Sequence, residues 1–183
     1  MFCCTSKPPV LIDSYPSYTG AGVLFVDGLV ALAGIQKHFK LSKPDAVARL
    51  SGFGGRRDPT DIDWCSTAWR EVIEELFDVK PVPITLVQTL RTQITRRVVS
   101  ESNGYVQIRC TFADLTQVLR LCRGLQSALY PSMPKTLDDL ILKRSPITSC
   151  EIGSLALLPI THDLMVDPDF MSDLAALRIG RTA

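Results

Sequence analysis

The stretch "SGFGGRRDPTDIDWCSTAWREVIEELFDV", residues 51–79, sets a glycine-rich basic loop directly before a segment rich in acids. Asp63 or Ser66 is suited to cap a helix, which we expect to run to about Phe77. Apolar residues recur along that segment at the spacing of one helix face, and they are Ala68, Val72, Ile73 and Leu76. The stretch therefore predicts a loop followed by an amphipathic helix.

Three glutamates share one face of this expected helix. Glu71, Glu74 and Glu75 stand at positions i, i+3 and i+4, where like charges destabilise a helix by a few tenths of a kcal/mol per pair. A hard divalent cation would remove that repulsion, whereas the plain alternative is a solvated acidic face. The preceding glycines let the backbone approach a ligand closely, and Arg56 and Arg57 can meet phosphate oxygens. The pattern favours a site that holds a metal ion against a phosphate.

The same residues resemble the Nudix box, G-x5-E-x7-R-E-U-x-E-E-x-G-U, where U is aliphatic. Gly54-Gly55 matches the paired glycines, Asp61 stands in the place of the first glutamate, and 70–75 reads R-E-V-I-E-E. There are departures: eight residues rather than seven separate Asp61 from Arg70, and Phe77 and Asp78 replace a glycine and an aliphatic residue. An apolar hairpin before the box and the late segment "CEIGSLALLPI" also look similar to the family.

The resemblance implies site residues and a cofactor. Family members bind one to three Mg²⁺ or Mn²⁺ ions, so the backbone carbonyl of Gly54 would be a ligand here. Glu74 and Glu75 would be the main carboxylate ligands, and Glu71 a ligand or the base that prepares the attacking water. Arg70 would orient a glutamate through an ion pair. Many members add an acid from outside the box, for which the candidates are Glu151, with a solvent-exposed strand start as its alternative, and the weaker Glu101.

Candidate substrate contacts are less specific. Arginines that could meet phosphates are Arg56, Arg57, Arg91, Arg96 and Arg97, although arginines on a strand are more often solvated. Aromatic side chains that could stack on a base are Phe39, Trp64, Trp69 and Tyr105, although an aromatic residue more often belongs to the core.

The rest of the chain predicts a mixed sheet with helices. Asp27-Gly28 and Asn103-Gly104 are hairpin signals between apolar runs. We expect one long or bent strand over 84–99, a strand over 105–112, helices over 115–129 and 136–143, a strand over 151–160 and a helical end within 163–179. This order indicates an α/β, or layered α+β, fold. The resemblance narrows it to a Nudix-like α/β/α sandwich with a mixed central sheet. We expect an irregular lead-in, 1–19, and one domain, 20–183, with a helical insertion around 114–145.

Composition sets the class of protein. The chain has 183 residues, of which 46% are hydrophobic and 21% charged, and a net charge of +1. It is therefore globular, without a bulk attraction to nucleic acid or membrane. Its six cysteines form no C-x-x-C pair and it has two histidines, which argues against a zinc site and for reduced thiols in a core. No run of 18 apolar residues and no secretory signal is present, so we expect a cytoplasmic protein, with the nucleus left open.

The predicted function is metal-dependent hydrolysis of the diphosphate bond of a nucleoside diphosphate linked to another moiety. The substrate would be a nucleotide-type small molecule, with no membrane partner, and homodimer formation stays open. The leading alternative is an mRNA decapping enzyme acting on capped RNA, since the basic segment 91–97 and the insertion could serve RNA. An alternative of another class is a non-catalytic Nudix-fold nucleotide-binding module, whose usual signature is loss of the box glutamates.

Overall fold

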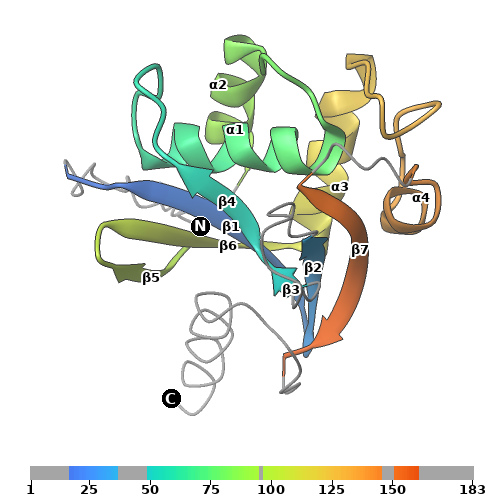
Figure 1. Ribbon diagram of the computed structural model, residues 1–183, viewed down its shortest axis with the longest axis horizontal. Coiled ribbons are helices and arrows are strands. Elements are labelled where there is room, and N and C mark those ends of the chain that lie inside the picture. Colours follow the sequence, from blue (N-terminus) through green and yellow to red (C-terminus); the bar gives the residue numbers. More distant parts are fainter. Residues whose placement is uncertain (1–16, 37–48, 95–96, 146–150, 161–183) are drawn as a thin grey trace, which may run out of the picture.

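The computed structural model describes residues 17–36, 49–94, 97–145 and 151–160, and Figure 1 shows their arrangement. The strands are β1 (Gly20–Asp27), β2 (Val30–Gln36), β3 (Arg49–Ser51), β4 (Phe53–Arg56), β5 (Arg97–Ser102), β6 (Tyr105–Thr111) and β7 (Ile152–Pro159). The helices are α1 (Trp64–Phe77), α2 (Ile84–Gln93), α3 (Phe112–Leu121), which a short 3-10 turn (Cys122–Gly124) continues, and α4 (Leu137–Leu142).

The strands form one mixed sheet. Its main order is β3-β2-β1-β6-β5, with β4 paired to β1 and β7 paired to β2. The pair of β1 and β6 is parallel, and the other pairs are antiparallel. A mixed sheet covered by helices confirms the predicted layered α/β class. The predicted division into a lead-in and one domain with an insertion stays a prediction.

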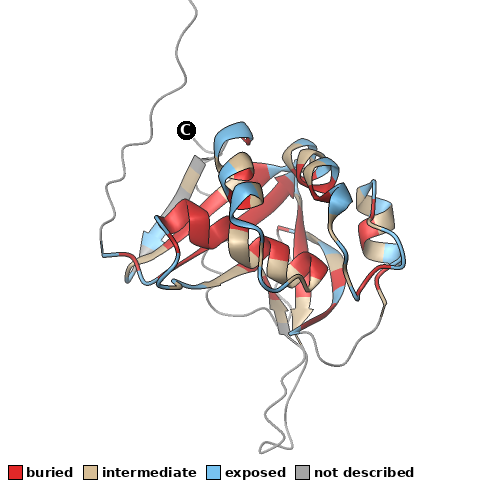
Figure 2. Cartoon of the chain, turned by 90° about the horizontal axis from the view of Figure 1, so that it is seen from above, coloured by how far each residue is buried: buried red, intermediate tan, exposed pale blue. Residues whose placement is uncertain are grey.

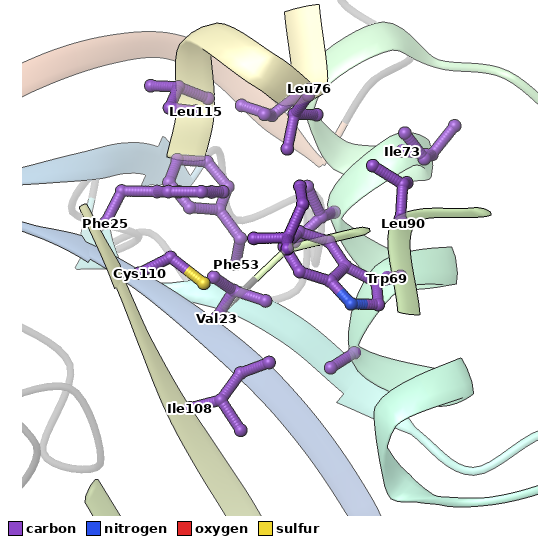
Figure 3. Close-up of a cluster of buried hydrophobic side chains, with 14 of the residues drawn as sticks. Val23, Phe25, Phe53, Trp69, Ile73, Leu76, Leu90, Ile108, Cys110 and Leu115 are labelled. Carbon is purple, nitrogen blue, oxygen red and sulfur yellow. The ribbon is translucent and has the colours of Figure 1, made fainter. Parts of the chain in front are cut away.

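The larger hydrophobic core lies between the sheet and the helices. Figure 3 shows side chains of β1, β4 and β6 meeting those of α1, α2 and α3, with Trp69 of α1 fully buried among them. The predicted apolar face of α1 is confirmed, because Ala68, Val72, Ile73 and Leu76 have no exposed surface. Figure 2 shows the same division on the helices, whose buried residues face the sheet. Packing of α1 across β1 and β4 therefore sets the helix against the glycine-rich strand.

A second, smaller cluster contains alternate residues of β1 and β2. Leu24, Val26, Ala31, Ala33 and Ile160 are buried together, apart from the larger core. Successive side chains of a strand point to opposite faces of the sheet, so Val23 and Phe25 join the helix-covered core while Leu24 and Val26 join this cluster. Both faces of the sheet therefore exclude water at this point.

The predicted strand over 84–99 is wrong for most of its length. Residues 84–93 form helix α2, and only its end belongs to a strand, β5. Pro83 stands at the helix N-cap, where a missing N–H costs nothing, and Val87 and Leu90 are buried at helical spacing. Threonines that suggest a strand instead donate their hydroxyls to carbonyls four residues earlier, Thr89 to Thr85 and Thr92 to Gln88.

Other expected elements are confirmed with shifted bounds. Both hairpins are present, and Asn103 and Gly104 take the positive φ angles of 50° and 79° that such a tight turn needs. Helix α3 begins three residues before its predicted start, because Thr111 and Asp114 form a reciprocal capping box. Its predicted end is wrong, since 125–129 is not helical. α4 and β7 lie within the predicted 136–143 and 151–160.

Some predictions concern residues outside the described part of the chain. These are most of the lead-in, the helical end within 163–179, and Cys3, Cys4, Phe39, Arg96 and Cys150. Three cysteines that the structure does describe are free and buried, as expected of core thiols, and burial raises the pKa of Cys122 to about 12. No helix within the described ranges is long and apolar enough to cross a membrane.

Candidate active site at the glycine strand and helix α1

Helix α1 begins at a locally built cap. Asp63 is the N-cap residue, and one of its carboxylate oxygens accepts from the backbone N–H and the hydroxyl of Ser66, both at 2.8 Å. Its other oxygen pairs with Arg91 of α2. The cap satisfies a free N–H of the first turn, as its sequence pattern predicts. Arg91 therefore ties α2 to the start of α1, and its predicted contact with a substrate phosphate stays a prediction.

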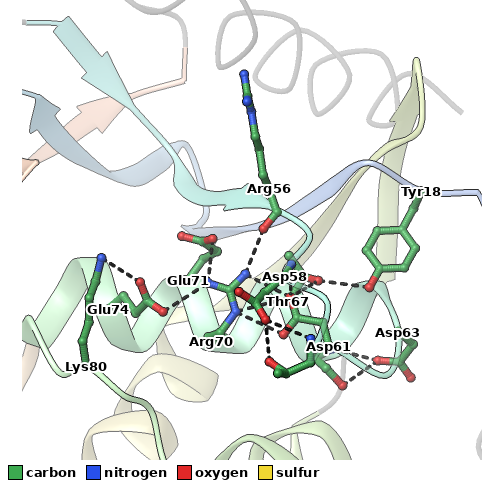
Figure 4. A network of polar contacts seen from close by, with 12 residues as sticks. Tyr18, Arg56, Asp58, Asp61, Asp63, Thr67, Arg70, Glu71, Glu74 and Lys80 are labelled. Carbon is green, nitrogen blue, oxygen red and sulfur yellow. Dashed lines mark hydrogen bonds and ion pairs between the residues drawn. The ribbon is translucent and has the colours of Figure 1, made fainter.

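Arg70 connects the loop before α1 to the glutamates of the helix. Its guanidinium lies 3.0 Å from Asp61, 2.8 Å from Glu71 and 3.1 Å from Glu74 (Figure 4). It also donates to the backbone carbonyl of Arg56 at 2.8 Å. Arg70 therefore orients two glutamates and the end of the glycine strand, which is the role that the resemblance implies for it.

Asp61 holds the guanidinium of Arg70 through an ion pair. Burial alone would raise the pKa of the Asp61 carboxyl, but hydrogen bonds from Arg70, the Asp58 backbone and Thr67 outweigh burial and lower it. The Thr67 hydroxyl donates to Asp61 at 2.7 Å and lies 3.1 Å from the hydroxyl of Tyr18. Asp61 thus stays ionised, and the extra residue between it and Arg70 does not prevent their contact.

The glycine strand lies directly against the acidic face. The backbone N–H of Gly54 donates to Oε2 of Glu75 at 2.8 Å. A side chain at Gly55 would place its Cβ 2.5 Å from a carboxylate oxygen of Glu71, which is closer than real Cβ contacts come. A side chain at position 55 would therefore have to displace the carboxylate of Glu71, whereas glycine leaves that space to it. The two glycines and two of the glutamates form one site.

Glu75 is a buried carboxyl group with negatively charged neighbours. Its pKa lies well above the usual carboxyl value, first because burial removes water and then because Glu71 repels its charge. The charges of Glu151 and Glu74 raise it further, while the Gly54 N–H lowers it. Burial likewise raises the pKa of Glu71, against the attraction of Arg70. The nearby cations of the protein therefore do not offset the rise in the pKa values of Glu71 and Glu75.

Glu74 differs from its neighbours because both of its oxygens face a cation. Oε1 lies 3.1 Å from Arg70, and Oε2 lies 2.9 Å from the Nζ atom of Lys80. Within the described ranges, no three His, Cys, Asp or Glu side chains are gathered as a metal site. Arg70 pairs with Glu71 and Glu74, and Lys80 pairs with Glu74. The carboxylates are therefore neighbours but are not gathered around one point.

The end of α1 explains the missing glycine of the motif. Phe77 is fully buried, and its ring lies 6.2 Å from that of Tyr130. The left-handed conformation that a glycine would take falls on Asp78, at φ 52°, whose N–H donates to the carbonyl of Glu74 at 2.8 Å. Phe77 thus stays in the last helical turn, where its ring fills the core.

The other predicted site residues come from several elements of the fold. Glu151 precedes β7, is exposed, and accepts from the side chain of Gln36 at 3.3 Å. Arg56 extends away from Arg70 in Figure 4, and the Arg57 guanidinium lies 4.6 Å from the centre of the Tyr18 ring. Arg97 begins β5, at one end of the strand order, and Glu101 lies exposed in the same strand. The structure gathers the box residues, and the phosphate contacts proposed for the arginines stay predictions.

The proposed stacking residues behave mainly as core. Trp64 is 3% exposed and Trp69 is fully buried, so neither presents a ring to a ligand. The Tyr105 ring packs against Gly20, and its hydroxyl lies against Gly22 and Gly54.

Two residues in contact with the site were missed from the sequence. Neither Lys80, three residues after the end of α1, nor Arg144, next to Lys143, belongs to a motif, and only the fold brings Arg144 to the helix end.

Comparisons with known proteins find similar solved structures but no matching family model or curated protein. No protein-family model matches the chain, and neither does any curated protein. Solved structures similar to this chain include a "NUDIX hydrolase" from Nitrosomonas europaea, with 13% identity and a TM-score of 0.46, covering 89% of this chain and 90% of that one. A "mutT/nudix family protein" from Listeria innocua has 14% identity and a TM-score of 0.43, covering 90% and 92%. A "hydrolase, NUDIX family" from Clostridium perfringens has 12% identity and a TM-score of 0.39, covering 88% and 97%. Likenesses of this size do not assign a family.

Proposed function

We propose that this chain is a divergent Nudix hydrolase that cleaves a diphosphate bond in a nucleoside diphosphate linked to another moiety, with the help of Mg²⁺ or Mn²⁺. The observation that carries the proposal is the contact between the glycine strand and the acidic helix. Gly54 donates to Glu75, and Glu71 fills the space beside Gly55, so the two halves of the sequence motif meet in space.

The donor set fits a hard divalent cation. Glu71 and Glu75 are neighbouring carboxylates with raised pKa values, and the charge of Glu151 also acts on Glu75. Mg²⁺ and Mn²⁺ prefer carboxylate and carbonyl oxygens, so Glu71, Glu75, Glu151 and the Gly54 carbonyl would hold the ion. Glu74 is a weaker candidate, since Arg70 and Lys80 already face its two oxygens. When bound, such an ion neutralises phosphate charge and lowers the pKa of bound water.

The chain's own residues supply orientation. Asp61 holds Arg70 in place, and Arg70 in turn aims the carboxylate of Glu71 at 2.8 Å. As the alternative to binding the ion, Glu71 would be the base that accepts a proton from an attacking water, since Arg70 fixes its carboxylate beside the glycine strand. Arg56 and Arg57, exposed just after the glycines, are the nearest basic residues in sequence for substrate phosphates.

The proposal is tested with Glu75→Gln, which keeps the shape of the side chain but removes its charge. A panel of nucleotide sugars, dinucleotides, nucleoside triphosphates and capped RNA is incubated with Mg²⁺ or Mn²⁺, and products are resolved by mass. We expect the unaltered chain to cleave at least one substrate and Glu75→Gln to lose more than about 100-fold in turnover, beyond the loss typical of outer-shell changes. Asp138→Asn, at an exposed acid of α4, is the control for loss of an acidic charge and should keep full turnover.

Each outcome separates the alternatives. Turnover that survives in Glu75→Gln contradicts the proposal. Cleavage of capped RNA alone points to decapping. Nucleotide binding by the unaltered chain without any product, with either metal, points to the non-catalytic module.

A further inference from the structure

The last turn of α1 is capped by side chains from a distant part of the chain. The carbonyls of the last residues of a helix have no partner within the helix. Here Arg144 donates to the carbonyl of Glu75 at 2.9 Å and to that of Leu76 at 2.8 Å. The Ser127 hydroxyl donates to the carbonyl of Phe77. A cation at this end also suits the negative pole of the helix dipole.

Arg144 holds a second element at the same time. One of its nitrogens donates to the carbonyl of Ile152 at 2.8 Å, and the other lies 3.3 Å from the Tyr130 hydroxyl. Arg144 is only 9% exposed, although its side chain carries a charge. The planar guanidinium presents several donors in a rigid fork, so the positions of these acceptors are fixed relative to one another. Arg144 thus joins the end of α1 to the start of β7.

Both joined elements carry candidate site residues. Glu75 is held at its carbonyl by Arg144 and at its carboxylate by the backbone of Gly54. Glu151 directly precedes Ile152, whose carbonyl Arg144 also holds, and its charge acts on Glu75. Nothing in the sequence connects these two glutamates, which are separated by most of the predicted insertion. The buried arginine is a physical link between them.

We propose that Arg144 is a positioning residue that sets Glu75 and Glu151 at the separation needed to share one divalent cation. This inference rests on the proposed function. It also assigns a role to segment 125–145, which supplies Ser127, Tyr130 and Arg144 to the end of α1. Removing the guanidinium would leave the helix intact, because its own hydrogen bonds remain, but would free the last turn to move against β7.

The experiment measures Mn²⁺ binding by electron paramagnetic resonance, independently of turnover. Arg144→Met removes the donors, and Arg144→Lys keeps the charge but not the fork. Leu119→Ala, in the core at α3, is the control for lost stability alone. All chains are compared at a temperature at which circular dichroism shows them folded. We expect Arg144→Met to bind Mn²⁺ about 10–100-fold more weakly, the range typical of outer-shell partners, and Arg144→Lys to fall between it and the unaltered chain.

The outcomes separate this inference from the proposed function. If the unaltered chain binds Mn²⁺ and both Arg144 variants bind it as tightly as Leu119→Ala does, the positioning role is wrong while the proposed function stands. If the unaltered chain binds no Mn²⁺, the proposed function fails and this inference fails with it. If Arg144→Met does not fold, Arg144→Lys decides alone: weakened Mn²⁺ binding relative to Leu119→Ala supports the role, and equal binding overturns it.

Discussion

The two ends of helix α1 are stabilised in different ways. At the N-terminal end, Asp63 caps a residue three positions away, and Asp61 meets Arg70 nine positions away. At the C-terminal end, the carbonyls of the last turn find donors in Arg144 and Ser127, which lie 50 to 69 positions further along the chain. The N-terminal end is built mainly from its own neighbourhood, with Arg91 and Tyr18 as more distant contacts. At the C-terminal end, Asp78 supplies one local donor, and the other donors to the last carbonyls come from a distant segment.

This difference shows how a motif can change while its acidic face is kept. The contacts of the motif residues run along the helix, from the pair of Asp61 and Arg70 to the bond between Gly54 and Glu75 in the last turn. At the C-terminal end, the usual glycine is replaced by a buried Phe77 followed by a left-handed Asp78. Donors from the distant segment 125–145 cap the carbonyls of the helix there.

Phe77→Ala, at the C-terminal end of α1, is the substitution expected to destabilise the protein most. The ring is fully buried and packs beside Tyr130, so its loss leaves a cavity in the core. We expect the free energy of unfolding to fall by about 3–5 kcal/mol, measured by urea denaturation. Ile84→Ala, at an exposed position of α2, is the control and should change little. A loss no larger than that of the control would show that the C-terminal end does not depend on this packing.

Asp61→Asn tests the N-terminal end and gives it a pH signature. We expect a loss of about 1.5–3 kcal/mol at neutral pH, the value of hydrogen bonds to charged groups. The pKa of Asp61 is lowered in the folded state, so its contribution is present above the unfolded pKa and is lost as pH falls through the folded pKa. The variant should therefore lose less stability on acidification.

The measurement for Asp61 is urea denaturation across the acidic range. Asp138→Asn, at an exposed acid in α4, serves as the control. An unchanged acid profile in Asp61→Asn, relative to that control, would contradict the assigned role of Asp61.

Asp78→Gly is the smallest change and should act in the opposite direction. The left-handed conformation at φ 52° strains any residue with a Cβ, and a negative charge is unfavourable at a helix C-terminus. We expect a gain of about 1 kcal/mol from glycine, seen as a higher urea midpoint. Asp78→Ala removes the charge but keeps the Cβ, so it should gain less. Equal gains in both variants would assign the effect to charge rather than to backbone strain.

Much of the candidate site was predictable because its residues lie within one continuous stretch. The spacing of Glu71 and Glu75 on a helix, and the glycines before it, indicated that both would face one site. The strand predicted over 84–99 proved instead to be a helix for most of its length. There, the β propensity of the residues was outweighed by Pro83 at the N-cap and by the helical spacing of the buried Val87 and Leu90.

The sequence by itself determined the acidic helix, its N-cap, its apolar face and the two hairpins. Each of these follows from side-chain spacing or turn chemistry over a few residues, and such interactions need no knowledge of distant partners. Only the tertiary structure decided that Gly54 donates to Glu75, that Lys80 faces Glu74 and that Arg144 closes the end of α1. Such contacts depend on how the sheet and the helices pack, and no local sequence pattern predicts that geometry.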